Sequence, residues 1–167
     1  MSGGTPAGDR LLIVNADDYG LTPGVSRAIL RAHSDGIVTS TSALALAPGF
    51  AASAPALRDT PAIGVGAHLA AVGEDPPLLS AREVPTLVDG RGRLASSWRV
   101  FLPRVAAGRI DMEDVRREFT AQVDCLRDAG LVLDHVDTHQ HVHLWPSVGA
   151  VVLDVAEKAG VGALRII

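Results

Sequence analysis

Short apolar runs alternate with helix-like segments along this chain, and the alternation restricts its possible folds more than any other feature. Strands are expected at residues 11–15, 37–46, 62–69, 131–139 and 161–167. Capping residues and apolar spacing predict helices at residues 23–34, 49–57, 98–107, 111–130 and 145–160. Strands that alternate with helices form a parallel sheet with right-handed crossovers. The sequence therefore predicts an α/β fold, in which residues 16–20 form a polar loop after the first strand.

The number of expected strands indicates part of a barrel. An eight-unit (β/α) barrel typically needs about 250 residues, whereas this chain has 167. Three further units of roughly 30 residues each would bring the pattern close to that size. No closing helix follows the expected strand at residues 161–167. We therefore expect a single α/β domain over residues 11–167, a parallel (β/α) barrel that is incomplete at its C-terminus, preceded by a disordered tail over residues 1–10.

The longest connection in this scheme runs over residues 70–111 and carries four prolines. Its length excludes a tight turn, and ordered excursions of this kind often form lids over a binding site. Asp89 and Gly90 predict a small hairpin within it.

Composition and charge exclude several classes of partner. The 15 Lys and Arg residues are outnumbered by 19 Asp and Glu residues, which gives a net charge of -4. Such a chain lacks the basic surface that binds nucleic acid or an anionic membrane. Cys125 is the only cysteine, so an intrachain disulfide and a cysteine-based zinc site are excluded. Because the opening apolar run is also too short for a signal peptide or a membrane span, we expect a cytoplasmic protein.

Ionisable side chains stand where the expected strands end. Asp17 and Asp18 follow the first strand, His68 closes the third, and His139 closes the fourth. The carboxyl ends of parallel strands open on one side of the sheet, so these side chains should converge there. One carboxylate and two imidazoles form a ligand set for a single divalent metal ion, and the second carboxylate is a candidate general base. Zinc, magnesium, manganese and iron all suit such ligands, and we expect magnesium or zinc.

Each of these residues also has a structural interpretation. An Asp pair after a strand is commonly turn chemistry or a helix cap, and His68 alone is typical of a hydrogen-bonded core histidine. A solvated loop rarely places histidines at alternate positions, as His139, His141 and His143 are placed, so this cluster favours a metal or catalytic role.

Strand geometry adds a possible supporting residue. His135, Asp137 and His139 should point to the same side of the fourth strand, which lets Asp137 orient a metal ligand. We expect His135 and His33 to be structural.

Four segments together resemble a known family. The stretches LLIVNADDYGLTPGV, GIVTSTSALA, GVGAHL and LDHVDTHQHVHLWP occur in the family's order between Leu11 and Pro146. They resemble the YdjC-type carbohydrate deacetylases, which include chitooligosaccharide deacetylases and a branch associated with hopanoid biosynthesis. The resemblance implies an irregular (β/α) barrel that hydrolyses the N-acetyl group of an amino sugar or oligosaccharide and releases acetate.

The resemblance also implies roles for individual residues. Asp18, His68 and His139 would bind the metal ion, and Asp17 would be the base that takes a proton from the attacking water. A swap of roles within the Asp pair would leave the sequence unchanged. Many family members continue after GVGAHL with Asn-Leu-Thr, whereas this chain has Ala70, Ala71 and Val72. The family's C-terminal third has no counterpart after Ile167, so the alternative to a full deacetylase is a truncated form of it.

Other residues near these segments are candidates for supporting or substrate contacts. Arg165 can reach the site from the last strand or form a surface ion pair, and Tyr19 and Trp145 can stack on a sugar ring or serve as packing. His141 and His143 join them as possible supporting or substrate contacts.

Two other functions compete with deacetylation. The first is a catalytically silent metal-binding domain that dimerises to cover its exposed C-terminal strand, and we expect a homo-oligomer on the same grounds. The second is a phosphoesterase on the same barrel, but the motif regions are poor in Lys and Arg.

Overall fold

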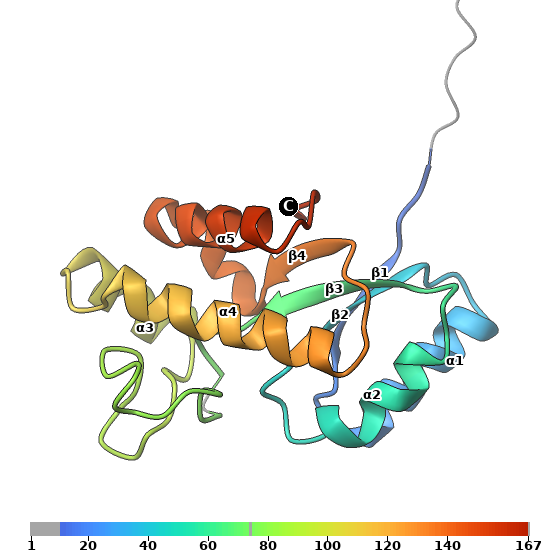
Figure 1. The fold of residues 1–167 in the computed structure, drawn as a ribbon, viewed down its shortest axis with the longest axis horizontal. Coiled ribbons are helices and arrows are strands. Elements are labelled where there is room, and N and C mark those ends of the chain that lie inside the picture. The colour runs from blue at the N-terminus through green and yellow to red at the C-terminus, as the bar shows by residue number, and fades with distance from the viewer. Residues whose placement is uncertain (1–10, 74, 167) are drawn as a thin grey trace, which may run out of the picture.

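A four-stranded parallel sheet forms the centre of the computed structural model, which describes residues 11–73 and 75–166 (Figure 1). The expected tail over residues 1–10 lies outside the described residues. The strands follow one another across the sheet in chain order and are β1 (Asn15–Tyr19), β2 (Ser40–Ala43), β3 (Gly64–Leu69) and β4 (His135–Thr138). The predicted α/β fold with a parallel sheet is confirmed. A closed barrel is not seen in the described part of the chain.

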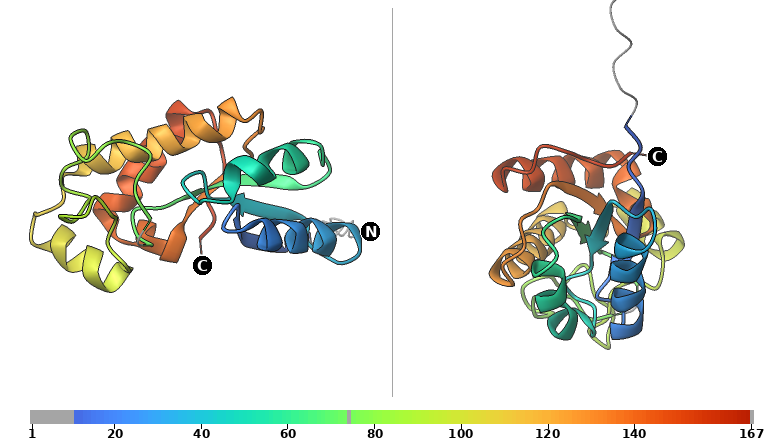
Figure 2. Two further views of the ribbon diagram at one scale, coloured as in Figure 1. Left: turned by 90° about the horizontal axis from the view of Figure 1, so that it is seen from below. Right: turned by 90° about the vertical axis from the view of Figure 1, so that its right-hand side faces the viewer.

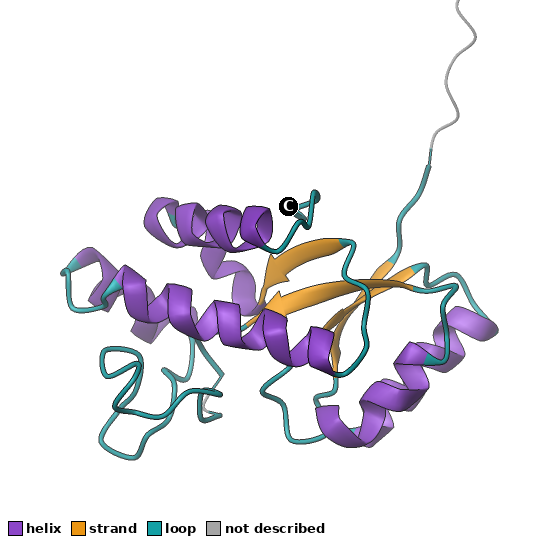
Figure 3. Cartoon of the chain, in the orientation of Figure 1, coloured by secondary structure: helices purple, strands orange, loops and turns teal. Residues whose placement is uncertain are grey.

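The α-helices begin and end close to the predicted positions, whereas the short 3₁₀ helix after the fourth strand was not predicted (Figure 3). They are α1 (Pro23–Ser34), α2 (Phe50–Arg58), α3 (Trp98–Ala106), α4 (Met112–Asp128), the short 3₁₀ helix η1 (His139–Leu144) and α5 (Pro146–Lys158). Thr22 caps α1 through the N–H of Val25, and Asp111 caps α4 through the N–H of Glu113. Within the described residues, no helix has the length and apolar character needed to cross a membrane.

The two faces of the sheet differ in polarity, because successive side chains of a strand point to opposite faces. On one face, Val65, Ala67 and Val136 are buried in the core with apolar side chains of α2, α4 and α5. Figure 2 shows how the helices lie around the sheet. The other face is mainly polar and carries Asn15, Asp17, Ser40, Ser42, His68, His135 and Asp137. The sheet therefore presents a row of hydrogen-bonding groups instead of a second apolar core.

The first strand begins later than predicted. Leu11, Leu12 and Ile13 precede the sheet and are 90%, 79% and 75% exposed, whereas the expected polar loop at residues 16–20 largely belongs to β1. Pairing with β2 decides where the strand begins, because Asn15 is the first residue in register with β2 and Ala16 follows it. The register is irregular between Ala16 and Tyr19, where Asp18 has a left-handed φ of 66°.

The C-terminal part of the predicted pattern also differs. Residues 161–166 make only one isolated parallel bridge, Leu164 to Val136, instead of a full fifth strand, and Ile167 lies outside the described residues. The fourth strand is shorter than predicted, because His139 begins η1. Gly130 and Gly160 follow α4 and α5 with left-handed φ of 81° and 63°, whereas Gly36, after α1, does not have a left-handed φ.

Buried polar side chains of α4 anchor the long excursion at residues 70–111. The Glu118 carboxylate is fully buried and accepts hydrogen bonds from the backbone N–H groups of Leu78 and Leu79, at 2.9 and 3.1 Å. Gln122 pairs with both the N–H and the carbonyl of Ala70, each at 2.8 Å. The predicted hairpin is present as an antiparallel bridge between Val88 and Leu94. Side chains of α4 thus hold the part of this excursion that precedes α3.

Replacement of Glu118 by alanine tests this anchoring. The variant leaves the N–H groups of Leu78 and Leu79 without their buried acceptor, which should lower the free energy of unfolding by about 1–3 kcal/mol. Asp124→Ala is the matched control, because Asp124 is exposed on the same helix, and it should change stability by less than about 0.5 kcal/mol. Urea unfolding followed by circular dichroism measures both values, and equal stabilities of the two variants would contradict the assignment.

Candidate metal centre

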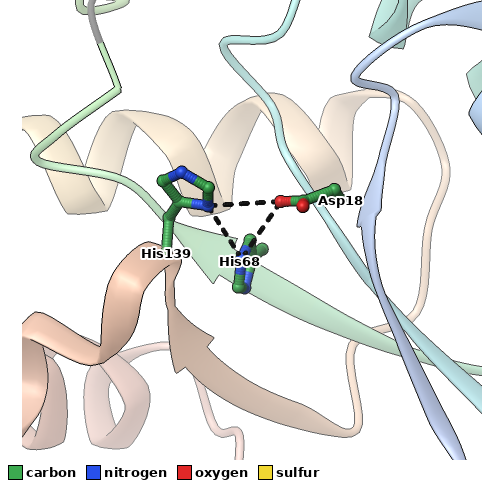
Figure 4. A group of neighbouring side chains, drawn as sticks. All are labelled: Asp18, His68 and His139. Carbon is green, nitrogen blue, oxygen red and sulfur yellow. Dashed lines mark hydrogen bonds and ion pairs between the residues drawn. The ribbon is translucent and has the colours of Figure 1, made fainter. Parts of the chain in front are cut away.

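Three side chains from separate elements meet at the carboxyl ends of the strands (Figure 4). Asp18 lies near the end of β1, His68 lies near the end of β3, and His139 is the first residue of η1 after β4. Asp18 Oδ1 lies 3.4 Å from His68 Nε2 and 3.2 Å from His139 Nδ1. The two imidazole nitrogens are 3.4 Å apart. The structure thus brings together the three residues that strand order predicted, and their atoms are close enough to share one cation.

The local state of Asp18 is typical of a ligand. Asp18 Oδ1 is buried and makes no hydrogen bond within the described residues, although it faces both imidazoles. The imidazoles of His139 and His68 hold the pKa of this carboxyl well below its usual range, so it is ionised. Its left-handed backbone is uncommon for a residue with a side chain and recurs at functional sites. A buried anionic oxygen without a hydrogen bond is a position where a cation would be stabilised.

Asp137 fixes the orientation of the His68 ring. His68 Nδ1 lies 2.5 Å from Asp137 Oδ1, which leaves Nε2 facing Asp18. Burial lowers the pKa of His68, but Asp137 and Asp18 outweigh it and raise that pKa to about 9. The Asp137 carboxylate is fully buried and also accepts a hydrogen bond from Ser42 Oγ at 2.7 Å. The predicted orienting contact of Asp137 is therefore present in the structure.

Arg165 connects the two aspartates behind the centre. Its guanidinium donates to both oxygens of Asp17, at 2.6 and 2.9 Å, and its Nη2 lies 2.8 Å from Asp137 Oδ2. Asn15 donates a further hydrogen bond to Asp17 Oδ1 at 2.8 Å. The sequence allowed Arg165 either to reach the site or to form a surface ion pair. In the structure Arg165 forms its ion pairs with Asp17 and Asp137 inside the site. Asp17 is held as part of this network and is not a member of the ligand triad.

The histidine cluster divides into different roles. His139 joins the triad, whereas His143 is buried and bonds through Nδ1 to Thr138 Oγ1 at 2.7 Å. Burial lowers the pKa of His143. Gln140 and His141 have left-handed φ values of 54° and 55°, so the chain turns sharply after the first histidine. The regular strand spacing that the sequence suggested is lost at this turn.

Tyr19 does not reach the site. It is fully buried in the apolar core, and its hydroxyl donates to the carbonyl of Ser53 at 2.8 Å. The expectation that Tyr19 contacts substrate is therefore wrong, since β1 turns this side chain towards α2. Sequence reasoning in turn missed Asn15 and Ser42. Asn15 lies between Val14 and Ala16, and this alternation was the available signal, whereas Ser42 lies in a polar run and carried no such signal.

Fold and geometry together define a parallel α/β protein with a candidate three-ligand metal centre at the carboxyl ends of its strands. The family model described as YdjC-like protein matches residues 11–167, and the chain belongs to this family. The chain is 37% identical over 147 residues to a carbohydrate deacetylase of Brevibacillus brevis, covering 88% of this chain and 56% of the relative. It is 36% identical to carbohydrate deacetylase 1 of Listeria innocua, covering 92% of this chain and 60% of the relative.

A solved structure supports the fold assignment. The crystal structure described as that of a cellobiose-phosphate cleavage protein from Enterococcus faecalis V583 superposes with a TM-score of 0.82 at 33% identity. The match covers 90% of this chain and 57% of that protein. The chain therefore spans somewhat more than half the length of the proteins it resembles.

The raised pKa of His68 predicts a pH-dependent metal affinity. Below its pKa of about 9 the imidazole is protonated in the metal-free protein, and a cation must displace that proton. The apparent affinity for Zn²⁺ should therefore rise up to about tenfold per pH unit from pH 6 to about 8, and level off above pH 9. Zinc titrations against a chelator of known affinity at each pH measure this slope. In Asp137→Asn the rise should move to lower pH, and a slope that is identical in both proteins would contradict the assignment to His68.

Proposed function

We propose that this chain carries the metal centre of a hydrolase that removes the N-acetyl group from an amino sugar or oligosaccharide. In this proposal one divalent cation is bound by Asp18, His68 and His139. The observation that carries it is Asp18 Oδ1, a buried anionic oxygen without a hydrogen bond that faces two imidazole nitrogens at 3.2 and 3.4 Å. The similar bacterial proteins are carbohydrate deacetylases, and they support deacetylation of a carbohydrate as the reaction.

The donor atoms fit zinc better than magnesium. The distances of 3.2 to 3.4 Å between them match the edges of a tetrahedron, which measure about 3.3 Å when each ligand lies about 2.0 Å from a central zinc ion. Magnesium prefers oxygen ligands in octahedral geometry, and two of the three donors here are imidazoles. We therefore propose zinc as the first metal to test.

The remaining groups of the site have assignable tasks in amide hydrolysis. A divalent cation supplies Lewis acidity and lowers the pKa of a water molecule, which is the nucleophile that hydrolysis requires. Asp17 Oδ1 accepts from both Arg165 and Asn15, whereas Oδ2 accepts only from Arg165 among the described residues. Oδ2 therefore keeps an acceptor position, and we assign it the proton of the attacking water. Arg165 holds this carboxylate in place and compensates the buried charge of Asp137.

One observation favours the competing function of a silent metal-binding domain. Arg165 engages both oxygens of Asp17, as it would in a purely structural ion pair. Both functions need the same metal triad, so acetate release separates them. Self-association stays a prediction of the sequence.

His139→Ala should abolish stoichiometric metal binding. The variant removes one of three ligands, whereas His141→Ala removes a neighbouring imidazole that lies outside the triad and serves as the matched control. Metal content after reconstitution with zinc and gel filtration, determined by mass spectrometry, measures the effect. If His139→Ala kept its metal while His141→Ala lost it, the ligand assignment would be wrong.

Acetate release from an N-acetylated chitooligosaccharide by the zinc-loaded chain tests the reaction itself. We expect turnover in the native protein and a decrease of about two to four powers of ten in Asp17→Asn, with the metal content unchanged. Asp59→Asn is the charge-matched control, because Asp59 is exposed, and it should keep full turnover. A zinc-loaded native chain without acetate release would leave the silent-domain function. Near-normal turnover of Asp17→Asn would exclude Asp17 as the base.

A further inference from the structure

Ser42 lies in the middle of the polar face of the sheet and has three polar neighbours. It is fully buried in β2. Its hydroxyl oxygen lies 2.9 Å from Asn15 Nδ2, 2.7 Å from Asp137 Oδ2 and 3.2 Å from His135 Nε2. Asn15 belongs to β1, and the other two neighbours belong to β4. One hydroxyl group therefore bonds to residues of both the first and the last strand of the sheet.

Gly66 makes the contact between β2 and β4 possible. Ser42, Gly66 and His135 lie in register on β2, β3 and β4, so Gly66 stands between the other two residues. A methyl group on Gly66 would overlap the His135 ring. Because glycine has no side chain, the imidazole lies over β3 and reaches Ser42. The sequence thus leaves room for this ring in the interior of the sheet.

The number of protons at Ser42 fixes the direction of its hydrogen bonds. A hydroxyl group donates one hydrogen bond and accepts two. Asn15 Nδ2 also donates to a carboxylate oxygen of Asp17, so this nitrogen is a donor and gives its second N–H to Ser42. The Asp137 carboxylate can only accept, so the single Ser42 proton points towards it. The remaining lone pair of Ser42 faces His135, whose Nε2 must therefore donate.

We propose that Ser42 is a positioning residue of the metal centre, and that His135 fixes the direction in which its hydroxyl group donates. Ser42 donates to Asp137, which in turn holds the His68 ring with Nε2 facing the triad. Loss of the hydroxyl group leaves the buried carboxylate with one donor fewer and lets the His68 ring move away from its binding orientation. The proposal rests on the metal centre of the proposed function and does not depend on the substrate.

Ser42 also connects this support to the proposed base. Asn15 donates one N–H to Asp17 Oδ1 at 2.8 Å and the other to Ser42 at 2.9 Å. The Oδ1 atom of Asn15 accepts from Ser40 Oγ at 2.5 Å, which holds the amide in this orientation. A change at Ser42 therefore reaches both the metal ligand and the base, although Ser42 bonds to neither of them.

Zinc affinity of the folded chain tests the positioning role. Ser42→Ala should weaken zinc binding by about 3- to 10-fold, whereas Ser42→Thr keeps the hydroxyl group and should stay within about twofold of the native affinity. Ser40→Ala is the matched control, because Ser40 lies on the same strand and face and bonds to Asn15 instead of Asp137. Competition with a chelator measures the affinities, and urea unfolding measures stability separately. A merely structural role would lower stability and leave the zinc affinities of Ser42→Ala and Ser40→Ala equal, which would overturn the proposal.

A double-mutant cycle with Asp137→Asn tests the route of the effect. Ser42→Ala should weaken zinc binding in the native background and have little further effect once Asp137 has lost its carboxylate, because Ser42 acts through that group. An equal effect in both backgrounds would exclude Asp137 as the route and overturn the proposal.

Ring nitrogen signals of the metal-free chain test the hydrogen-bond directions at the pH of the affinity measurements. Nitrogen-15 NMR should show a proton on Nε2 of His135, and the ring signals of His68 should change in Ser42→Ala. The ring of His33, which bonds to the Val38 carbonyl at 2.7 Å, is the internal reference and should not change. A His135 ring without a proton on Nε2, or unchanged His68 signals, would overturn the proposal.

Acetate release separates failure of this proposal from failure of the proposed function. Weaker zinc binding in Ser42→Ala, together with a native chain that releases no acetate, would keep the positioning role and exclude the deacetylase function. Acetate release by the native chain, together with equal zinc affinities of Ser42→Ala and Ser40→Ala, would keep the deacetylase function and exclude the positioning role.

Discussion

The buried carboxylate of Asp137 is the group on which the rest of the site depends. It is fully buried and binds Ser42 of β2, His68 of β3 and Arg165 beyond α5, so one side chain ties three parts of the chain together. A buried carboxylate is stable only when hydrogen bonds and opposite charge surround it. Arg165 supplies that charge and at the same time holds Asp17. The orientation of the His68 ring and the position of Asp17 therefore both follow from the need to compensate a single buried charge.

The backbone around the metal centre is less regular than the sheet that supports it. Asp18, Gln140 and His141 adopt left-handed φ values that cost free energy for residues with side chains. Contacts elsewhere offset this cost. Thr138 Oγ1 accepts from the backbone N–H of His143, and Gln140 accepts from the N–H of Trp98, so the turn after His139 is closed on both sides. Such a turn holds the His139 imidazole in place before a ligand binds, which lowers the entropic cost of binding.

Local sequence signals predicted the helices and the convergence of the triad, because caps act within a few residues and parallel strands share one open end. They did not predict which apolar residues enter the sheet. Leu11 to Ile13 carry the same signal as a strand, and only pairing with β2 shows that the sheet begins at Asn15. The fourth strand was similarly expected to run to His139, although η1 begins there and the left-handed turn at Gln140 and His141 follows. The ion pairs of Arg165 with Asp17 and Asp137 join residues far apart in sequence and leave no periodic trace.

The polar face of the sheet carries the side chains that support the candidate metal triad. Parallel sheets usually bury both faces in apolar contacts. On this face, however, Ser42 accepts a hydrogen bond from Asn15 and donates one to Asp137, which links three strands. An open cavity of about 540 Å³ lies beside these residues, near the amino ends of the strands. The triad, its orienting carboxylate and Arg165 all lie within residues 11–166. The relatives are longer, since this chain covers 56% and 60% of two of them. The groups that the proposed metal site needs therefore lie within the residues described here.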